Sequence, residues 1–208
     1  KALKAKTGFT DEFCADTVEA ATVTAVDRYR RGEPVQTLGL STTIPPMPWR
    51  LFPILLDGKP TMIFADGGSG KSMLAMYFSM LIQSGTEHNG LAATKGNVLY
   101  LDWETEWTDQ ERRILMLKAG CAFDSSLSIQ VKYRRCSQPL ADDIEEIQRM
   151  VQEFSIDYII VDSLSAACGD DLKEQVVAAV FFKALMSLGK GTLIVTHVTN
   201  EGANNSYG

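Results

Sequence analysis

The stretch Met62-Ile63-Phe64-Ala65-Asp66-Gly67-Gly68-Ser69-Gly70-Lys71-Ser72 decides the fold. An apolar run leads into a glycine-rich turn, and the Lys-Ser pair opens a helical pattern, which is the setting of a phosphate-binding loop. Glycines let the backbone wrap a phosphate closely, while the loop amides and the helix N-terminus attract the anion. Ala65 stands where the common pattern has its first Gly. The predicted nucleotide-binding residues are Asp66, Gly67, Gly68, Ser69, Gly70, Lys71 and Ser72.

The composition narrows the class of protein. The chain has 208 residues, enough for one α/β domain and a small extension, with 45% hydrophobic and 22% charged residues. A net charge of −6 disfavours a broad nucleic-acid footprint. No apolar run approaches the roughly 20 residues that span a bilayer, so we expect no membrane partner. Four widely spaced cysteines predict reduced thiols and a cytoplasmic protein, and a first residue of Lys1 predicts a trimmed chain or a fragment.

Two parts follow from the pattern along the chain. Residues 1–48 are predicted to be a partly helical N-terminal extension and a proline-containing linker, and residues 49–208 the core. From Pro60 onward, apolar runs alternate with helical patterns, which predicts a three-layer α/β fold with a mostly parallel sheet. The expected strands are 61–65, 97–103, 128–134, 158–161 and 192–196, and the expected helices are 73–84, 108–119, 141–154 and 172–188. In the last helix, the residues expected to face inward are Val176, Val180, Phe181, Ala184 and Leu188.

Asp162 ends the apolar run 158–161, so its carboxylate is expected at the carboxyl edge of the sheet, where ligands bind in open α/β folds. A carboxylate there can share a magnesium ion with the hydroxyl of Ser72. The alternative is that Asp162 caps the next segment. We predict Ser72 and Asp162 as the metal ligands.

Glu104 follows the second strand at the same predicted edge. A carboxylate beside the terminal phosphate can orient and deprotonate an attacking water, which is the task of a general base. Asp102 and Glu106 compete for this role, and a solvent-facing structural Glu104 is a further alternative. His197 ends the fifth strand, where a polar side chain can donate a hydrogen bond toward the terminal phosphate; an isolated histidine is more often structural.

Taken in order, these residues resemble the RecA-like P-loop ATPases. Within them they resemble the subgroup of the hexameric plasmid replicative helicase RepA and of phage and plasmid "AAA family" ATPases. The resemblance is carried by Ala65–Ser72, Val98–Glu104, Tyr158–Ser163 and Thr196–Thr199. It implies a RecA-like core in which the strand of Asp162 is central, flanked by the strands of Glu104 and His197. It also implies magnesium-dependent ATP hydrolysis, with Lys71, Glu104 and His197 as catalytic groups, at a site shared between subunits of a homo-oligomeric ring such as a hexamer.

The chain departs from the family in two places. Asn200 stands where many relatives have Lys, and the sequence ends at Gly208, before the final strands where an arginine or lysine finger is expected. In related phosphoryl transfer such a finger contributes roughly 10³ to 10⁵ in rate.

Two functions of different classes fit the pattern, and a third fits less well. The first is an ATPase motor core, a helicase of the DNA-replication type that acts on single-stranded DNA. The loops expected to contact DNA, residues 165–171 and 199–208, contain no Lys or Arg, and Tyr207 is their sole aromatic residue. The second is an ATP-dependent regulatory or assembly switch without helicase activity. A small-molecule kinase is disfavoured because no lid with clustered arginines is evident.

Overall fold

The computed structural model describes residues 17–24, 26, 35, 37–39, 43, 45–121, 123, 129–169 and 175–197. Contacts divide the chain into two units, Lys1–Pro46 and Met47–Gly208. In the first unit residues 17–24 are helical, and the hydroxyls of Thr22 and Thr24 donate to the carbonyl oxygens four residues earlier, at 2.7 and 2.8 Å. The described part of this unit is therefore a short exposed helix and isolated linker residues.

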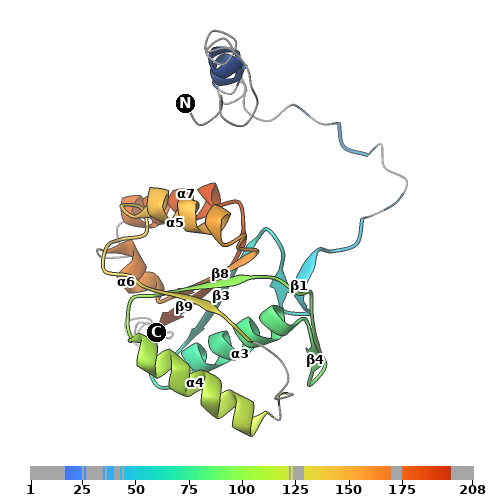
Figure 1. Ribbon diagram of the computed structural model, residues 1–208, viewed down its shortest axis with the longest axis vertical. Coiled ribbons are helices and arrows are strands. Elements are labelled where there is room, and N and C mark those ends of the chain that lie inside the picture. The colour runs from blue at the N-terminus through green and yellow to red at the C-terminus, as the bar shows by residue number, and fades with distance from the viewer. Residues whose placement is uncertain are drawn as a thin grey trace, which may run out of the picture. The chain divides into compact units, whose positions relative to one another are not determined.

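The second unit is built on a five-stranded parallel sheet (Figure 1). Its strands are β3 (Pro60–Ala65), β6 (Val98–Asp102), β7 (Lys132–Arg135), β8 (Tyr158–Asp162) and β9 (Gly191–His197). They lie in the order β3-β9-β8-β6-β7, with every neighbouring pair parallel. β8 is central, between the strand that leads to Glu104 and the strand that ends at His197. The α/β fold class is confirmed, with the strand order that the RecA-like resemblance implies.

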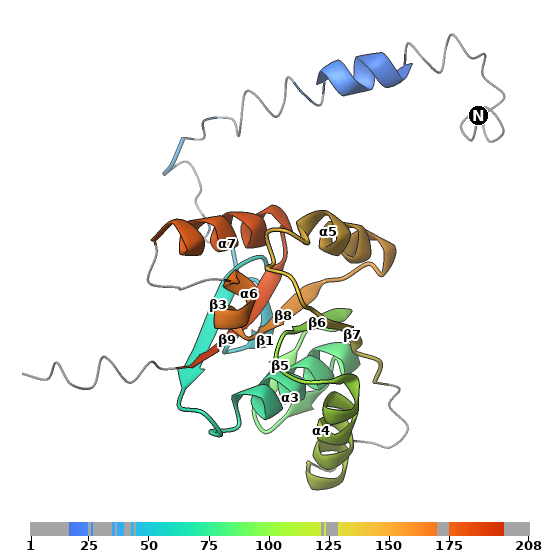
Figure 2. The ribbon, with the colours of Figure 1, turned by 90° about the vertical axis from the view of Figure 1, so that its left-hand side faces the viewer.

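Helices cover both faces of this sheet (Figure 2). One face carries α3 (Lys71–Ser84) and α4 (Trp107–Gly120), and the other carries α5 (Ile144–Glu153), α6 (Leu164–Cys168) and α7 (Gln175–Ser187). Alternate residues of a strand enter opposite cores: in β6, Leu99 and Leu101 pack with α5 to α7, whereas Val98 and Tyr100 pack with α3. This double burial explains why the central strands are continuous apolar runs.

A second, antiparallel sheet was not predicted from the sequence. Its strands are β1 (Trp49–Phe52), β2 (Leu55–Leu56), β4 (Glu87–His88) and β5 (Leu91–Ala93), in the order β2-β1-β5-β4. Strands of two to four residues are too short to show a period-2 pattern. Leu51 and Leu55 are nevertheless fully buried in the core beneath α3. The small sheet thus anchors the start of the second unit to the phosphate-loop side.

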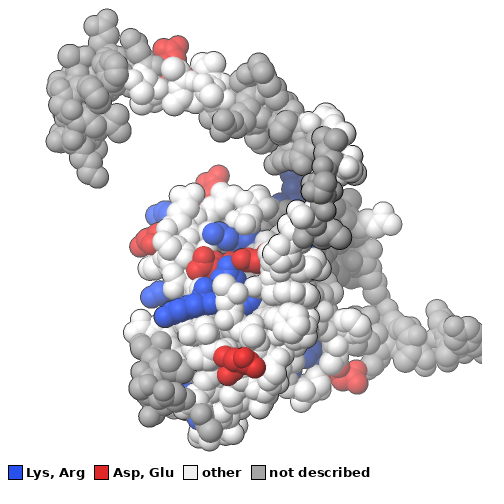
Figure 3. Space-filling view, turned by 90° about the vertical axis from the view of Figure 1, so that its right-hand side faces the viewer, with Lys and Arg blue, Asp and Glu red and all other residues white. Residues whose placement is uncertain are grey.

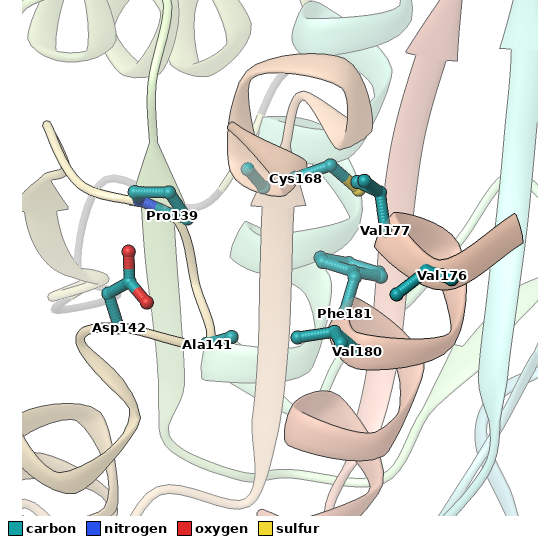
Figure 4. A pocket seen from close by; sticks show the side chains of 9 residues that line it. Pro139, Ala141, Asp142, Cys168, Val176, Val177, Val180 and Phe181 are labelled. Carbon is teal, nitrogen blue, oxygen red and sulfur yellow. The ribbon is translucent and has the colours of Figure 1, made fainter. Parts of the chain in front are cut away.

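The inward face predicted for the last helix is partly wrong. Phe181 and Leu188 are buried, but Val176 is 71% and Val180 49% exposed. The two valines line a cavity of about 210 Å³ between α6, α7 and the turn at residues 139–142 (Figure 4). Among the described residues that line it, the carboxylate of Asp142 is the one charged group. No helix in the described residues is both long and apolar enough to cross a bilayer.

Candidate functional site

Most of the predicted site residues line a cavity of about 290 Å³ at the carboxyl edge of the large sheet. The loops that follow β3 and β6 and the end of β9 meet there because parallel strands end at the same edge. The cavity is lined by Gly68, Ser69, Gly70, Lys71, Ser72, Met73, Glu104, Arg113 and His197. Asp66 and Gly67 belong to the same loop but do not line the cavity, and Asp162 is buried at the end of β8.

The glycine-rich loop has the backbone shape that its sequence predicts. Gly68 and Gly70 have φ of 73° and 88°, in the left-handed region that favours glycine. Gly70 is the N-cap of α3, so no side chain caps the helix, and no acidic residue lies in its first turn. An added Cβ at Gly67, Gly68 or Gly70 would meet no atom within 4 Å. The loop therefore presents uncapped amides next to open space, which suits an anion.

Lys71 is buried, and its ammonium is held by the loop itself. Nζ donates to the carbonyl oxygens of Ala65 at 2.7 Å and Asp66 at 2.8 Å, and lies 3.4 Å from the hydroxyl of Ser69. Nζ is also 3.3 Å from Nδ1 of His197. No ion pair joins this ammonium to a carboxylate among the described residues. Its charge is therefore available to an anion in the cavity.

His197 links the lysine to Glu104. It is the last residue of β9, in register with Ala65 of β3. Its Nδ1 faces Lys71, and its Nε2 lies 3.4 Å from Oε1 of Glu104. Because an ammonium only donates, Nδ1 is assigned as the acceptor, which places the proton of a neutral imidazole on Nε2, toward the carboxylate. The sequence predicted His197 at this edge but not its position between the cation and the carboxylate.

A buried carboxylate fixes the turn that carries Glu104. Oδ1 of Asp102 accepts from the backbone amides of Glu104 and Thr105, both at 2.9 Å. Oδ2 accepts from the Thr105 hydroxyl at 2.6 Å and from the Gln110 amide at 2.7 Å. Asp102 is fully buried and both of its oxygens are engaged, so it is a structural residue. Glu104 is 37% exposed and accepts a hydrogen bond from the hydroxyl of Ser163, so it keeps one face toward the cavity.

The two alternatives left open by the sequence can now be examined. Glu106 is the exposed N-cap residue of α4 and does not line the cavity. The N-cap of α6 is Ser163, so Asp162 lies one residue before the capping position. The geometry therefore favours Glu104 over its two competitors as the base, and it disfavours the capping alternative for Asp162.

One carboxylate oxygen of Asp162 has no hydrogen-bond partner. Oδ2 accepts from the hydroxyl of Tyr100 at 2.6 Å, whereas Oδ1 is buried with no hydrogen-bond partner. Burial, and then the charges of Glu104 and Asp102, raises the pKa of this carboxyl, while Tyr100 and Ser72 lower it. Ser72 is the second residue of α3 and lines the cavity. A free carboxylate oxygen and a cavity-lining hydroxyl are both oxygen ligands, which magnesium prefers.

Sequence reasoning missed two residues of the site. Tyr100 orients Asp162 from the neighbouring strand, and Arg113 of α4 lines the cavity. Nη1 of Arg113 is buried and has no hydrogen-bond partner. The signal for Arg113 was available: it lies at helical spacing from Gln110 and Leu117, on the face of α4 that packs inward. Burying an unpaired charge is unfavourable, so a charged residue on an inward helical face indicates a specific role.

Comparisons with known proteins give one family match and a similar solved structure. A family model described as an AAA domain matches residues 25–203. No curated protein matches the sequence. Among solved structures the chain is similar to a KaiC-like protein from the hyperthermophilic archaeon Pyrococcus horikoshii OT3, with 17% identity and a TM-score of 0.48. The match covers 71% of this chain and 64% of that one, so this chain spans less than two thirds of that protein.

Proposed function

Because the chain belongs to the AAA domain family, we propose that it binds ATP with magnesium in the cavity at the sheet edge and hydrolyses it there. One observation carries this proposal. Nδ1 of His197 lies 3.3 Å from Nζ of Lys71, Nε2 of the same ring lies 3.4 Å from Oε1 of Glu104, and Oδ1 of Asp162 at the same sheet edge has no hydrogen-bond partner. A cation and a carboxylate that line one cavity, with a free carboxylate oxygen at the same sheet edge, support binding of the phosphates, the attacking water and a metal ion there.

Each group of the site has its own role in the proposed reaction. The amides of the loop and the N-terminus of α3 hold the phosphates, and Lys71 turns from the loop carbonyls to the phosphate oxygens. Ser72 and Asp162 would hold the magnesium ion, which would neutralise charge on the phosphates. Glu104 accepts the proton of the attacking water, and its carboxylate is kept in place by Ser163 and by the Asp102 turn. His197 contacts Lys71 through Nδ1 and faces Glu104 through Nε2, so it connects the phosphate-binding lysine with the general base.

Three variants test the proposal. Lys71→Ala removes the phosphate-facing ammonium, so ATP binding measured by calorimetry is expected to be lost. Glu104→Gln keeps the shape and the Ser163 contact, so ATP remains bound while turnover falls by about 10² or more. Glu87→Gln in the exposed strand β4 is the matched control and leaves both unchanged. Full hydrolysis by Glu104→Gln would assign the base to another group, and unchanged affinity in Lys71→Ala would refute the nucleotide site.

At a finer level, we propose a cytoplasmic motor that works as a homo-oligomeric ring on single-stranded DNA. The resemblance to hexameric replicative helicases supports the ring motor. The three described cysteines form no disulfide, which fits the cytoplasmic part of the proposal. The alternative, a regulatory or assembly switch, is favoured by α6, which follows Asp162 and contains no Lys or Arg. Figure 3 likewise shows basic and acidic side chains next to each other on the face that it presents. The other predicted DNA loop, residues 199–208, lies outside the described residues.

Single-stranded DNA separates these two functions. A motor is expected to hydrolyse ATP faster when the strand is added at near-physiological salt, and to form rings when ATP is bound. A switch is expected to change its oligomeric state with ATP while its hydrolysis rate ignores DNA. Both readouts use the same preparation of the full-length protein.

A further inference from the structure

Thr105, the residue that follows the proposed base Glu104, has all of its polar atoms engaged in hydrogen bonds. Its amide and its hydroxyl both donate to the carboxylate of Asp102, at 2.9 and 2.6 Å. The hydroxyl also accepts from the side-chain amide of Gln110 at 3.1 Å. Its carbonyl oxygen accepts two further hydrogen bonds, both from side chains of the edge strand β7. The position of Glu104 therefore depends on how the next residue is held.

The two donors of β7 lie beside the turn because of the strand register. Arg135 pairs with Asp102 across the ladder, and Tyr133 lies two positions earlier, so both side chains leave the same face of the strand. The hydroxyl of Tyr133 is 3.2 Å and Nη1 of Arg135 is 2.5 Å from the carbonyl oxygen of Thr105. One backbone oxygen thus receives a neutral donor and a charged donor from one strand.

The two donors differ in burial. Tyr133 is half-buried, and burial followed by the charge of Asp102 raises its pKa to about 12, so its hydroxyl remains a donor at neutral pH. Arg135 is exposed, and within the described part of the chain it forms no ion pair. A hydrogen bond from an exposed cation contributes little to the free energy of unfolding. Stability alone is therefore a weak explanation for the contact of Arg135.

The contacts of Thr105 pull on the turn from two strands. Asp102 holds the amide from the end of β6, and the donors of β7 hold the carbonyl oxygen. Contacts at both ends of one residue limit the rotation of the turn. A general base must lie within hydrogen-bond reach of the proton that it accepts, and a small displacement of such a group can lower a rate strongly. The turn that carries Glu104 is thus held where precision matters.

We propose that two side chains of the edge strand, Tyr133 and Arg135, position the general base Glu104 through the backbone of the residue that follows it. This inference rests on the proposed function and adds two positioning residues that do not line the cavity. Because they act on the base and not on the phosphate loop, we expect their loss to lower kcat while the affinity for ATP is retained.

The first test compares substitutions of exposed arginines. Arg135→Met keeps the aliphatic stem and removes the donor, Arg135→Lys restores a donor, and Arg149→Met removes an exposed guanidinium that pairs with Glu146 on α5. We measure kcat for ATP and, by calorimetry, the affinity for a non-hydrolysable ATP analogue. For Arg135→Met we expect kcat to fall by about tenfold with the affinity within about twofold. Arg135→Lys should recover most of the rate, and Arg149→Met should behave as the wild type.

A double-mutant cycle shows whether Arg135 acts through the base. In Glu104→Gln the base is absent, so adding Arg135→Met is expected to lower the remaining rate by less than about twofold. A further loss of about tenfold in this background would show that Arg135 acts elsewhere and would overturn the inference. An unchanged kcat of Arg135→Met in the wild-type background would do the same.

Amide hydrogen exchange tests the positioning without ATP. We expect the amides of Glu104 and Thr105 to exchange faster in Arg135→Met than in the wild type or in Arg149→Met. Equal exchange in all three proteins would contradict the proposal. If Arg135→Met does not fold, Tyr133→Phe removes the other donor and is expected to show the same lower kcat and faster exchange. Failure of the proposed function is distinguishable, because the wild type would then bind no ATP analogue.

Discussion

Two neighbouring strands of the large sheet end in aspartates at the same register, yet the two ends differ. Asp102 of β6 pairs with Asp162 of β8 across the ladder, and both are buried. Both oxygens of Asp102 accept hydrogen bonds from the protein, whereas Asp162 keeps one oxygen without a partner. A saturated carboxylate holds a turn in place, and an unsaturated one has a position to offer to a metal. The hydrogen bonds that each carboxylate accepts thus distinguish two residues that look alike in the sequence.

The same substitution at both positions gives the largest expected contrast. In Asp102→Asn, either orientation of the amide brings its NH₂ group against donors that now bond to an oxygen. We expect the free energy of unfolding to fall by about 3 kcal/mol, measured by urea denaturation. In Asp162→Asn, the amide nitrogen can take the place of the unpartnered oxygen, and the change is expected to stay within about 1 kcal/mol.

For ATP hydrolysis the order of the two variants is expected to be the opposite, with the larger loss in Asp162→Asn. Asp162→Asn folds but loses the magnesium-dependent part of ATP hydrolysis, because its amide is a poor ligand for the ion. Similar losses of stability in both variants would contradict the distinction between the two strand ends.

A smaller effect is expected from Tyr100→Phe, which removes the one hydrogen bond that Asp162 receives from a neighbouring strand. We expect a loss of about 1 to 2 kcal/mol in the free energy of unfolding, since a buried carboxylate oxygen loses its donor. The magnesium concentration for half-maximal hydrolysis should rise, because Asp162 is no longer oriented. A double-mutant cycle with Asp162→Asn isolates the pair, and additive effects would show that Tyr100 acts elsewhere.

The smallest expected effect is a change of the free energy of unfolding with pH. Burial raises the pKa of Asp162 in the folded protein, so the folded state binds this proton more tightly than the unfolded chain does. The resulting destabilisation is absent below the unfolded pKa and fully present above the raised folded pKa. Relative to the wild type, Asp162→Asn should therefore gain stability as pH rises from about 4 to 7 without magnesium. Urea titrations at both pH values measure this, and a difference that does not change with pH would argue against a penalised carboxylate.

The large sheet was predictable because its strands are buried on both faces. The runs at residues 98–102 and 158–162 are entirely buried, and the alternation of strands and helices indicates parallel connections. The small antiparallel sheet was not predictable, because strands as short as Leu55–Leu56 have no pattern of their own and exist through tertiary contacts. The exposure of Val176 has a similar origin, since helical spacing alone does not say how wide the covered face is.

For the site, the sequence indicated which side chains meet but not how they are used. Residues after parallel strands share an edge, so Glu104, Asp162 and His197 were expected near Lys71. The partners that distinguish them are remote in sequence: Tyr100 is 62 positions from Asp162, and Lys71 is 126 positions from His197. No local pattern encodes such contacts. Arg113 had a local signal, a charge on an inward helical face, but its place in the cavity lining becomes visible only in the structure.

The contacts of Lys71 have a consequence for which molecules can enter the cavity. Its ammonium donates to two carbonyl oxygens of its own loop. A ligand must therefore replace these backbone hydrogen bonds before it can bind the lysine. Free inorganic phosphate or a nucleoside monophosphate has fewer oxygens to replace these two hydrogen bonds than a triphosphate, whose length allows it to contact the loop amides and the lysine together. We therefore expect the loop to bind the abundant small anions of the cell weakly and polyphosphates tightly.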